Sequence, residues 1–211
     1  MNFEHATRND AAFGVAFADR PEELVRFLKP GCAATIWRRK PDRDFQAWIN
    51  NLPPDQLPTG RAVLRYDAVF EMVQGLCDIA GTPHCSNRDM LVEDMSQLAQ
   101  VFSQLLDVRY LRLRLGKVTT NACRKFHIDA IEARLLCTYR GPGTQYGIST
   151  DGNDPKRVFA APTGAPILMR GRDWPDKQPS SLVHRSPPIE GSHQTRLVLV
   201  LDPVSDPGDE I

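Results

Sequence analysis

The sequence predicts an α+β fold in which a mostly helical first half packs against a strand-rich, jelly-roll-like second half. Apolar residues recur at three- and four-residue steps up to about residue 107 and at two-residue steps beyond it. The 211 residues are enough to bury a substantial core. We therefore expect a helical region at 1–107, a barrel at 108–202 and a flexible polar tail at 203–211, together forming one integrated domain.

The first half opens with short elements. Pro21 fits the first turn of a helix, for which Asp19 is the expected N-terminal cap, and Pro30 followed by glycine ends it. Residues 33–37 form a short apolar segment that predicts a strand. A second short helix is expected at 44–50, where a Leu-Pro-Pro run ends the pattern.

Two longer helices follow. Residues 61–80 repeat apolar side chains at helical spacing, and Gly81 is the expected end of that helix. Residues 86–107 predict the clearest helix, with Ser86 and Asp89 arranged like a capping box at its start. We expect its apolar stripe to pack on the second half, since a core stripe is the commonest use of such a pattern.

From Tyr110 the spacing of apolar residues changes to two. Leucines alternate with arginines over the next residues, which predicts a strand with one buried face. Short apolar runs separated by glycine and proline indicate further strands at 126–129, 133–139, 157–160, 167–170, 181–184 and 197–201. Such a series is typical of a barrel or a two-sheet sandwich.

Composition excludes several classes of protein. Charged residues form 25% of the chain, and Lys plus Arg equals Asp plus Glu at 26 each, so no net charge attracts nucleic acid. No apolar run is long enough to span a bilayer and the first residues lack the features of a signal peptide, so we expect a soluble, cytoplasmic protein without a membrane partner. The cysteines form no CxxC pair and fit free thiols in a reducing compartment; they are Cys32, Cys77, Cys85, Cys123 and Cys137.

A candidate metal site lies in the second half. His127 and Asp129 stand two positions apart in a predicted strand, where both side chains would project to the same face. His184 ends a later predicted strand and is the candidate third ligand. Two histidines and one carboxylate in this order form the set that holds Fe(II) by one face. Arg196, at the head of the last predicted strand, is placed to pair with a carboxylate co-substrate.

These residues carry a resemblance to a known family. The runs HIDAIEARLLCTY and LVHR, the glycine-rich turn between them and the arginine that opens a late strand resemble the double-stranded β-helix of the 2-oxoglutarate- and Fe(II)-dependent oxygenases. The resemblance implies that His127, Asp129 and His184 bind iron and that Arg196 binds the oxoacid carboxylate. That family often has a hydroxyl residue two positions after this arginine, where this chain has Val198.

A second resemblance covers nearly the whole chain. The runs RKFHIDAIEARLLCTYRGPGTQY and LVHRSPPIEGSHQTRLVLVLD are similar to the signature runs of a bacterial family known as domain of unknown function 1826. This family often accompanies zinc-homeostasis genes. The resemblance therefore implies a link to metal balance through neighbouring genes, and it implies no activity.

Other uses of the same residues remain open. Cys123 can join His127, Asp129 and His184 in a zinc site, because a thiolate ligand favours zinc over catalytic iron. Core packing is the ordinary use of a lone cysteine, and a hydrogen bond is the ordinary use of a histidine near a carboxylate. A barrel that binds no metal is the third alternative, which Val198 keeps open.

Further residues near the predicted site are candidates for contact with the substrate. Tyr139, Arg140 and Thr144 flank a Gly-Pro-Gly turn, which lacks the pattern of a phosphate-binding loop. Arg185 and Ser186 come directly after the third candidate ligand, in a segment that two prolines hold extended.

The sequence therefore predicts a non-haem Fe(II)- and 2-oxoglutarate-dependent oxygenase-like protein. The alternative is a non-catalytic zinc-binding or metal-homeostasis protein that uses the same site. No residue pattern specifies the substrate, a small molecule or a protein, or the oligomeric state.

Overall fold

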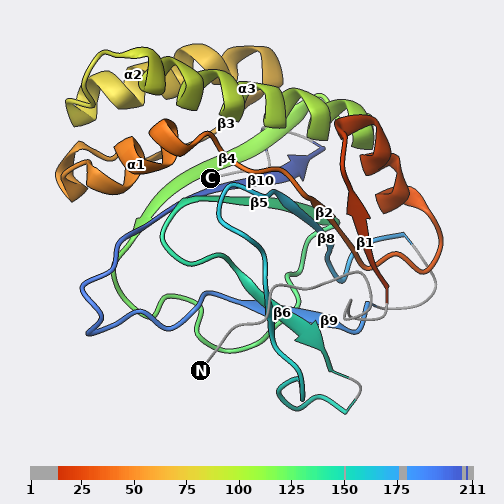
Figure 1. Cartoon of the computed structure of the whole chain (residues 1–211). Helices are drawn as coiled ribbons and strands as arrows, with labels where there is room; N and C mark the ends of the chain where they lie inside the picture. The colour runs from red at the N-terminus through yellow and green to blue at the C-terminus, as the bar shows by residue number, and fades with distance from the viewer. Residues whose placement is uncertain (1–13, 150, 176–179, 206–207, 209–211) are drawn as a thin grey trace.

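The computed structural model describes residues 14–149, 151–175, 180–205 and 208. Helices lie on one side of a large sheet and a small sheet lies on the other, which gives three layers (Figure 1). The large sheet has seven strands in the order β1-β2-β8-β5-β10-β4-β3, and the small sheet has three in the order β7-β6-β9. The chain therefore has a mixed α+β architecture, as its sequence predicts.

Both halves of the chain build the large sheet. Its strands are β1 (Val15–Ala18), β2 (Ala34–Trp37), β3 (Gly60–Arg65), β4 (Tyr110–Val118), β5 (Ala133–Arg140), β8 (Ile167–Arg170) and β10 (Arg196–Val204). The small sheet contains β6 (Gln145–Ile148), β7 (Phe159–Ala160) and β9 (Leu182–Arg185). Strands β1, β3 and β6 were not among the predicted strands. The first half, expected to be mostly helical, thus also supplies three strands of the large sheet.

The helices are α1 (Arg43–Asn51), α2 (Val69–Ala80) and α3 (Ser86–Leu106), with short 3-10 helices at η1 (Pro21–Leu28), η2 (Pro54–Gln56) and η3 (Tyr66–Ala68). Asp42 caps α1, since its side chain accepts hydrogen bonds from the backbone N–H groups of Asp44 and Phe45. Gly81 ends α2 with a φ of 67°, a left-handed conformation that glycine adopts without strain.

The single helix predicted at 61–80 is wrong in its first part. Gly60–Arg65 forms β3, which pairs antiparallel with β4 along its whole length. The spacing of apolar residues in this segment is compatible with a helix or a strand. Hydrogen bonding to the edge of β4 stabilises the strand. Only Val69–Ala80 forms the α-helix.

Two predicted helix caps are also wrong. The N-cap of η1 is Arg20, and the backbone N–H of Asp19 donates to the Glu23 carboxylate at 2.9 Å instead. Helix α3 has Cys85 as its N-cap and no capping hydrogen bond from a side chain. Ser86 is already the first helical residue, so its hydroxyl cannot serve as the N-cap acceptor of a capping box.

Two further segments differ from the prediction. Residues 126–129 do not form a strand, and their one ladder contact is an isolated bridge at His127. Strand β10 continues through Pro203 and Val204, which were assigned to the flexible tail, because β4 pairs with it to its end. The rest of the predicted tail lies largely outside the described residues.

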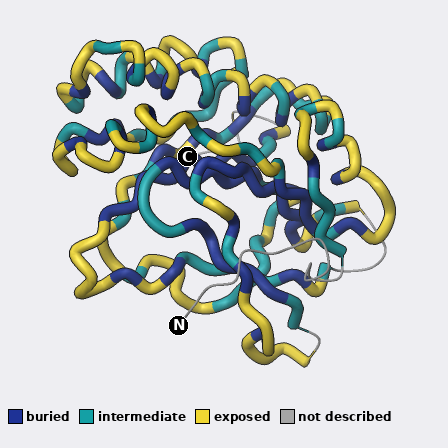
Figure 2. Tube along the Cα trace, viewed as in Figure 1, coloured by how far each residue is buried: buried dark blue, intermediate teal, exposed yellow. Residues whose placement is uncertain are grey.

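The central strands β5 and β10 are buried on both faces (Figure 2). On the helix side, β10 contributes Leu197, Leu199 and Leu201 to one core cluster. On the side of the small sheet, Val198 and Val200 join a second cluster. Because alternate residues of a strand project to opposite faces, the large sheet separates the two clusters.

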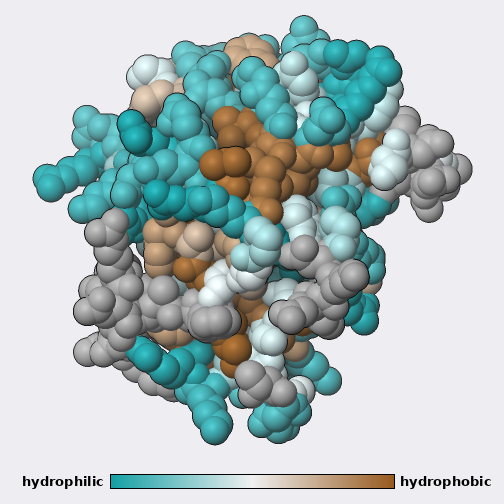
Figure 3. Space-filling view, turned by 90° about the vertical axis from the view of Figure 1, so that its right-hand side faces the viewer, coloured by the Kyte–Doolittle hydropathy of each residue, from teal (hydrophilic) through white to brown (hydrophobic). Residues whose placement is uncertain are grey.

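Figure 3 shows the face of the molecule on which β1 and β2 lie, the right-hand side of Figure 1. Apolar side chains gather near the centre of this face (Figure 3). The helix η1 contributes two exposed apolar residues to the protein surface, Val25 and Leu28. Among the described helices, none combines the length and the apolar character needed to cross a membrane.

Candidate metal centre

One backbone bridge brings the two candidate histidine ligands together. The His127 N–H donates to the His184 carbonyl at 3.1 Å, and the His184 N–H donates to the His127 carbonyl at 2.9 Å. His184 lies in β9, whereas His127 lies in the loop between β4 and β5. Strand β9 therefore sets the position of both imidazoles.

The candidate ligand set is His127, Asp129 and His184. One possible ligand atom from each of these residues lies within 4.8 Å of the others. His127 Nε2 is 3.5 Å and His184 Nε2 is 3.1 Å from the Asp129 carboxylate, and the two ring centres are 4.6 Å apart. Two imidazoles and a carboxylate that converge in this way have the chemistry to hold one divalent ion.

The backbone also orients the ring of His127. Its Nδ1 lies 2.8 Å from the Lys125 carbonyl oxygen, which only accepts hydrogen bonds, so Nδ1 carries the hydrogen. In the neutral ring this leaves the lone pair of Nε2 directed toward Asp129. A backbone carbonyl on the second ring nitrogen is the usual support of a metal-binding histidine.

Asp129 has an unsatisfied acceptor at this point of convergence. Its Oδ2 is buried, 2.7 Å from Arg134 and 3.1 Å from His184, but neither contact has the geometry of a hydrogen bond. Burial raises the pKa of Asp129, but interactions with His184, Arg134 and His127 outweigh burial and lower the pKa to about 2. The carboxylate is therefore charged at neutral pH, and it faces both the Arg134 guanidinium and the two imidazoles.

A second carboxylate holds Arg134 in place behind the candidate ligands. Arg134 makes two hydrogen bonds to Asp202, at 2.6 and 2.7 Å, and one of its terminal nitrogens reaches Asp129. Asp202 is 2% exposed, so this ion pair lies in the interior. Burial lowers the pKa of Arg134, but its two carboxylate partners raise the pKa above its usual value. The pair fixes one side of the Asp129 carboxylate.

Arg196 is a buried cation surrounded by neutral groups. Its side chain donates to the Pro142 carbonyl at 2.7 Å and to the hydroxyls of Ser186, Thr138 and Thr144 at 2.7, 3.3 and 3.5 Å. No carboxylate of the described residues forms an ion pair with it. Burial lowers the pKa of Arg196 to about 10, so it keeps its charge at neutral pH. An unpaired buried charge is costly, and this one fits an anionic ligand.

Thr138 of β5 supplies a hydroxyl next to Arg196, where β10 itself has only the apolar side chain of Val198. Val198 stands two positions after Arg196, and its registered partner on β5 is Thr138. The Thr138 hydroxyl, rather than a hydroxyl on β10, contacts the guanidinium. The register of two strands thus provides the polar group that Val198 does not.

The Gly-Pro-Gly turn shapes the same cluster. A Cβ on Gly143 would lie 1.7 Å from the Ala161 carbonyl oxygen, and Gly141 has a φ of 78°. Only glycine fits both positions, and the turn between them presents the Pro142 carbonyl to Arg196. The turn is therefore a structural support and not a phosphate-binding loop.

The other candidate contact residues divide into two groups. Ser186 and Thr144 contact Arg196, as described above. Tyr139 donates its hydroxyl to Asp94 on the helix side of the sheet, and Arg140 donates to the Leu52 carbonyl at the end of α1. The structure thus directs Tyr139 and Arg140 away from the metal centre.

The side chains of Arg185 and Cys123 are also not part of the candidate ligand set. The Arg185 guanidinium binds the Gln145 side chain at 2.7 Å and stacks over Phe126. Cys123 is exposed, and its thiol is not part of the cluster of possible metal ligands. Its backbone carbonyl accepts a hydrogen bond from Ser186 at 3.1 Å.

The structure adds three residues that sequence reasoning missed: Thr138, Arg134 and Asp202. Arg134 and Asp202 interrupt apolar strand runs, which is the one signal that pointed to buried polar contacts. Thr138 gave no such signal, because its role depends on the register between β5 and β10.

Solved structures define the class of fold. The chain is similar to the dioxygenase for auxin oxidation from rice, with 13% identity and a TM-score of 0.53 over 91% of this chain and 83% of that one. It is also similar to dioxygenase for auxin oxidation 1 from Arabidopsis thaliana, solved with 2-oxoglutarate, with 8% identity and a TM-score of 0.52 over 92% and 93%. The fold therefore resembles that of the 2-oxoglutarate- and Fe(II)-dependent oxygenases over most of the chain.

The sequence places the chain within one family. Residues 18–202 match the model described as "Protein of unknown function (DUF1826)", and the chain belongs to this family. A comparison with curated proteins found no significant match.

Proposed function

We propose that the protein is a non-haem Fe(II)- and 2-oxoglutarate-dependent oxygenase acting on an unidentified substrate. One observation carries the proposal: His127, Asp129 and His184 converge within 4.8 Å. The fold supports it, since two dioxygenases for auxin oxidation share it over most of this chain.

The donor set fits an iron ion. Two imidazole nitrogens and one carboxylate form a facial set that leaves other positions open. Oδ2 of Asp129 makes no hydrogen bond within the described residues, although Arg134 lies 2.7 Å from it, and a metal ion beside the two imidazoles would give this buried acceptor a further partner. Bound Fe(II) would supply the oxygen chemistry of this class, in which O₂ and 2-oxoglutarate give succinate and CO₂ and one oxygen atom passes to the substrate.

Arg196 and its hydroxyl neighbours are the proposed site for a carboxylate of 2-oxoglutarate. The guanidinium has no acidic partner among the described residues and would gain charge-assisted hydrogen bonds from that carboxylate. Ser186 touches Arg196 and lies two residues after His184, which connects the anion site to the metal centre. Tyr146 is fully buried and pairs in register with His184, and within the described part of the chain its hydroxyl has no hydrogen-bond partner. It is a further donor for the co-substrate.

The test is turnover of 2-oxoglutarate by protein purified without oxygen. Metal content is measured first, Fe(II) and 2-oxoglutarate are added, and succinate formation is followed on admission of oxygen. We expect slow succinate formation without a substrate, and its loss in His127→Ala and in His184→Ala. His193→Asn is the matched control, because His193 is exposed on a turn with a φ of 57° that asparagine tolerates.

The outcome also separates this proposal from the zinc alternative. Iron-free protein with stoichiometric zinc, unchanged by added Fe(II) and inactive toward 2-oxoglutarate, would favour a non-catalytic zinc protein. Metal content that is the same in wild type, His127→Ala and His184→Ala would contradict both readings.

A further inference from the structure

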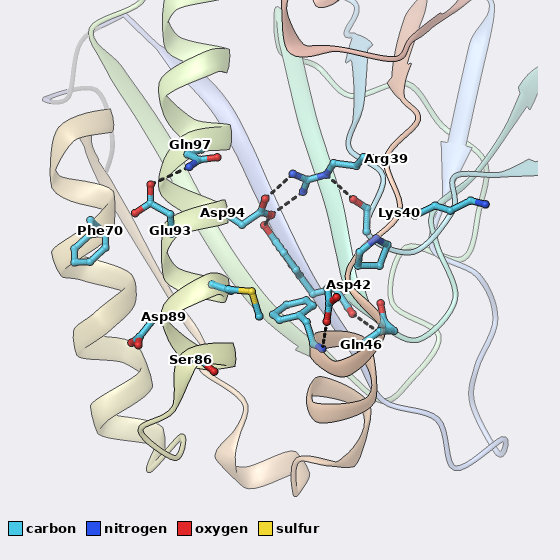
Figure 4. Close-up of a pocket in the computed structure, with 15 residues that line it drawn as sticks. Arg39, Lys40, Asp42, Gln46, Phe70, Ser86, Asp89, Glu93, Asp94 and Gln97 are labelled. Atoms are coloured by element: carbon cyan, nitrogen blue, oxygen red, sulfur yellow. Dashed lines mark hydrogen bonds and ion pairs between the residues drawn. The ribbon is translucent and has the colours of Figure 1, made fainter.

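A cavity of about 640 Å³ lies on the helix side of the large sheet (Figure 4). Its lining comes from α1, α2, α3, the segment after β2, and β5. Tyr139 of β5 lines this cavity, whereas its neighbour Thr138 contacts Arg196 on the opposite face of the strand. The sheet therefore separates the cavity from the metal centre, and the function proposed above does not use it.

The wall of the cavity toward the strands is a closed polar network. Arg39 binds the Asp94 carboxylate at 2.5 and 2.6 Å and donates to the Gly164 carbonyl at 2.8 Å. The Tyr139 hydroxyl donates to the same carboxylate at 2.6 Å. Burial lowers the pKa of Arg39, but Asp94 outweighs burial and raises the pKa. Because these two charges neutralise each other, this wall has no preference for a ligand of either sign.

The other charges of the cavity are mainly negative. Asp89 and Glu93 lie one turn apart on α3, are exposed, and stand on the side of α3 nearer Phe70 (Figure 4). Lys40 belongs to the lining, but its amine is directed away from the other labelled side chains (Figure 4). The Asp42 carboxylate adds a further negative charge at the start of α1.

Apolar side chains also line the cavity. Phe45 is buried, whereas Phe70 and Met90 are 39% and 42% exposed despite their size. Aromatic rings and a thioether accommodate flat apolar groups, and the faces of aromatic rings also attract cations. A cavity of this volume that combines apolar surface with polar side chains has the dimensions of a small-molecule site.

We propose that this cavity is a second ligand site, for a small molecule with a flat apolar ring and a protonated amine. The ring packs among Phe45, Phe70 and Met90, and the ammonium group lies beside Asp89 and Glu93. The same charges repel carboxylate ligands, so 2-oxoglutarate does not compete for this site.

The test uses the 211-residue chain labelled with ¹⁵N and three probes of similar size: 2-phenylethylammonium, 2-phenylethanol and 3-phenylpropanoate. We expect the ammonium probe to shift the amide resonances of the cavity residues in a saturable manner, with a Kd about threefold or more below that of the alcohol. The carboxylate probe should bind more weakly than either. Added salt should weaken the ammonium probe most, since salt screens exposed charges.

Substitutions of the cavity residues test whether these side chains bind the probes. Asp89→Asn with Glu93→Gln should remove the preference for the ammonium probe over the alcohol. Glu71→Gln is the matched control, because Glu71 is an exposed acidic residue of α2 that does not line the cavity. Met90→Ala should weaken all three probes, whereas Ile79→Ala, at an exposed position outside the cavity, should not.

Three results would overturn the proposal. The first is equal affinity for the three probes, and the second is an ammonium preference that survives the Asp89→Asn, Glu93→Gln double variant. The third is a set of cavity shifts that grows with protein concentration in the absence of probe, which would assign the cavity to contact between two copies of the chain. Each readout is independent of metal loading and of succinate formation.

Discussion

Thr138 and Val198 are paired across β5 and β10, and the Thr138 hydroxyl lies 3.3 Å from the Arg196 guanidinium that opens β10. One strand thus contributes the charge and its neighbour contributes the hydroxyl. The valine at position 198 therefore does not leave Arg196, the proposed anion-binding residue, without a hydroxyl from the neighbouring strand.

Replacing Thr138 by valine tests this pairing. Thr138→Val removes the hydroxyl while keeping a β-branched side chain, so we expect metal content to stay the same and the Kd for 2-oxoglutarate to rise about fivefold. Calorimetric titration of anaerobic, metal-loaded protein measures the Kd, and elemental analysis of the same sample measures the metal content. Thr35→Val, at a buried position of β2, is the control. Unchanged affinity in Thr138→Val would contradict a role for this hydroxyl.

The buried pair Arg134–Asp202 supports a second prediction. In Asp202→Asn, Arg134 loses its bidentate partner and is left with Asp129 as its one carboxylate contact among the described residues. The guanidinium then competes with a metal ion for that carboxylate, and we expect metal affinity to fall about tenfold or more. Competition with a coloured chelator measures it.

The control for this variant is an exposed pair of the same chemistry. Asp67→Asn breaks the contact between Arg65 and Asp67, which are about half exposed. We expect no change in metal affinity there, because exposed ion pairs contribute little. Equal metal affinity in Asp202→Asn and wild type would show that Arg134 does not position the ligand.

The free energy of unfolding should fall in alkaline solution. Burial raises the pKa of Cys137 to about 12 and that of Tyr146 to about 12. In the unfolded chain a cysteine loses its proton near pH 8.5 and a tyrosine near pH 10. Between those values and pH 12 the unfolded state binds fewer protons, so unfolding becomes easier as the pH rises. Below about pH 8 the two groups are protonated in both states and contribute no pH dependence.

Denaturant unfolding at pH 7.5, 9 and 10 measures this effect. Cys137→Ala should reduce the pH dependence between 8.5 and 10 by up to about 1.4 kcal/mol per pH unit. Cys123→Ser replaces an exposed thiol instead of a buried one and is the matched control. An unchanged slope in Cys137→Ala would contradict the assignment.

Two glycine substitutions should change stability in opposite directions. In Gly143→Ala the new methyl group would lie 1.7 Å from the Ala161 carbonyl oxygen, so we expect a loss of about 3 kcal/mol or more. Gly75 lies within α2, where a Cβ would meet no atom outside its own helix backbone and chain neighbours within 4 Å, so Gly75→Ala should stabilise the fold by about 0.5–1 kcal/mol. Thermal unfolding of both variants checks the sign.

The candidate metal ligands could be predicted from the spacing of residues in the sequence. His127 and Asp129 were expected to share the face of a strand, and the fold does bring both to His184. The expected reason was wrong, since the segment is a loop held by one bridge and not a strand. The three candidate ligands were predicted from their side-chain chemistry and their order in the sequence, and neither depends on residues 126–129 forming a strand.

The errors in the predicted fold have a similar cause, because a local sequence pattern does not specify the contacts between distant segments. Residues 60–65 fit a helix or a strand by periodicity, and the hydrogen bonds of β4 selected the strand. Strand β1 has four residues and pairs in parallel with β2, a contact that no local pattern indicates. Edge strands of this length depend on their neighbours for their conformation.

By itself, the sequence determined the mixed α+β class, the long helix α3, the central strands β4, β5 and β10, and the identity of three candidate metal ligands and an arginine. These follow from local periodicity and from the chemistry of the side chains. Only the tertiary structure decided that Thr138 faces Arg196, that Asp202 holds Arg134 behind Asp129, and that Tyr139 lines a cavity on the opposite face. Those relations depend on strand register and layer order, which contacts between distant segments determine.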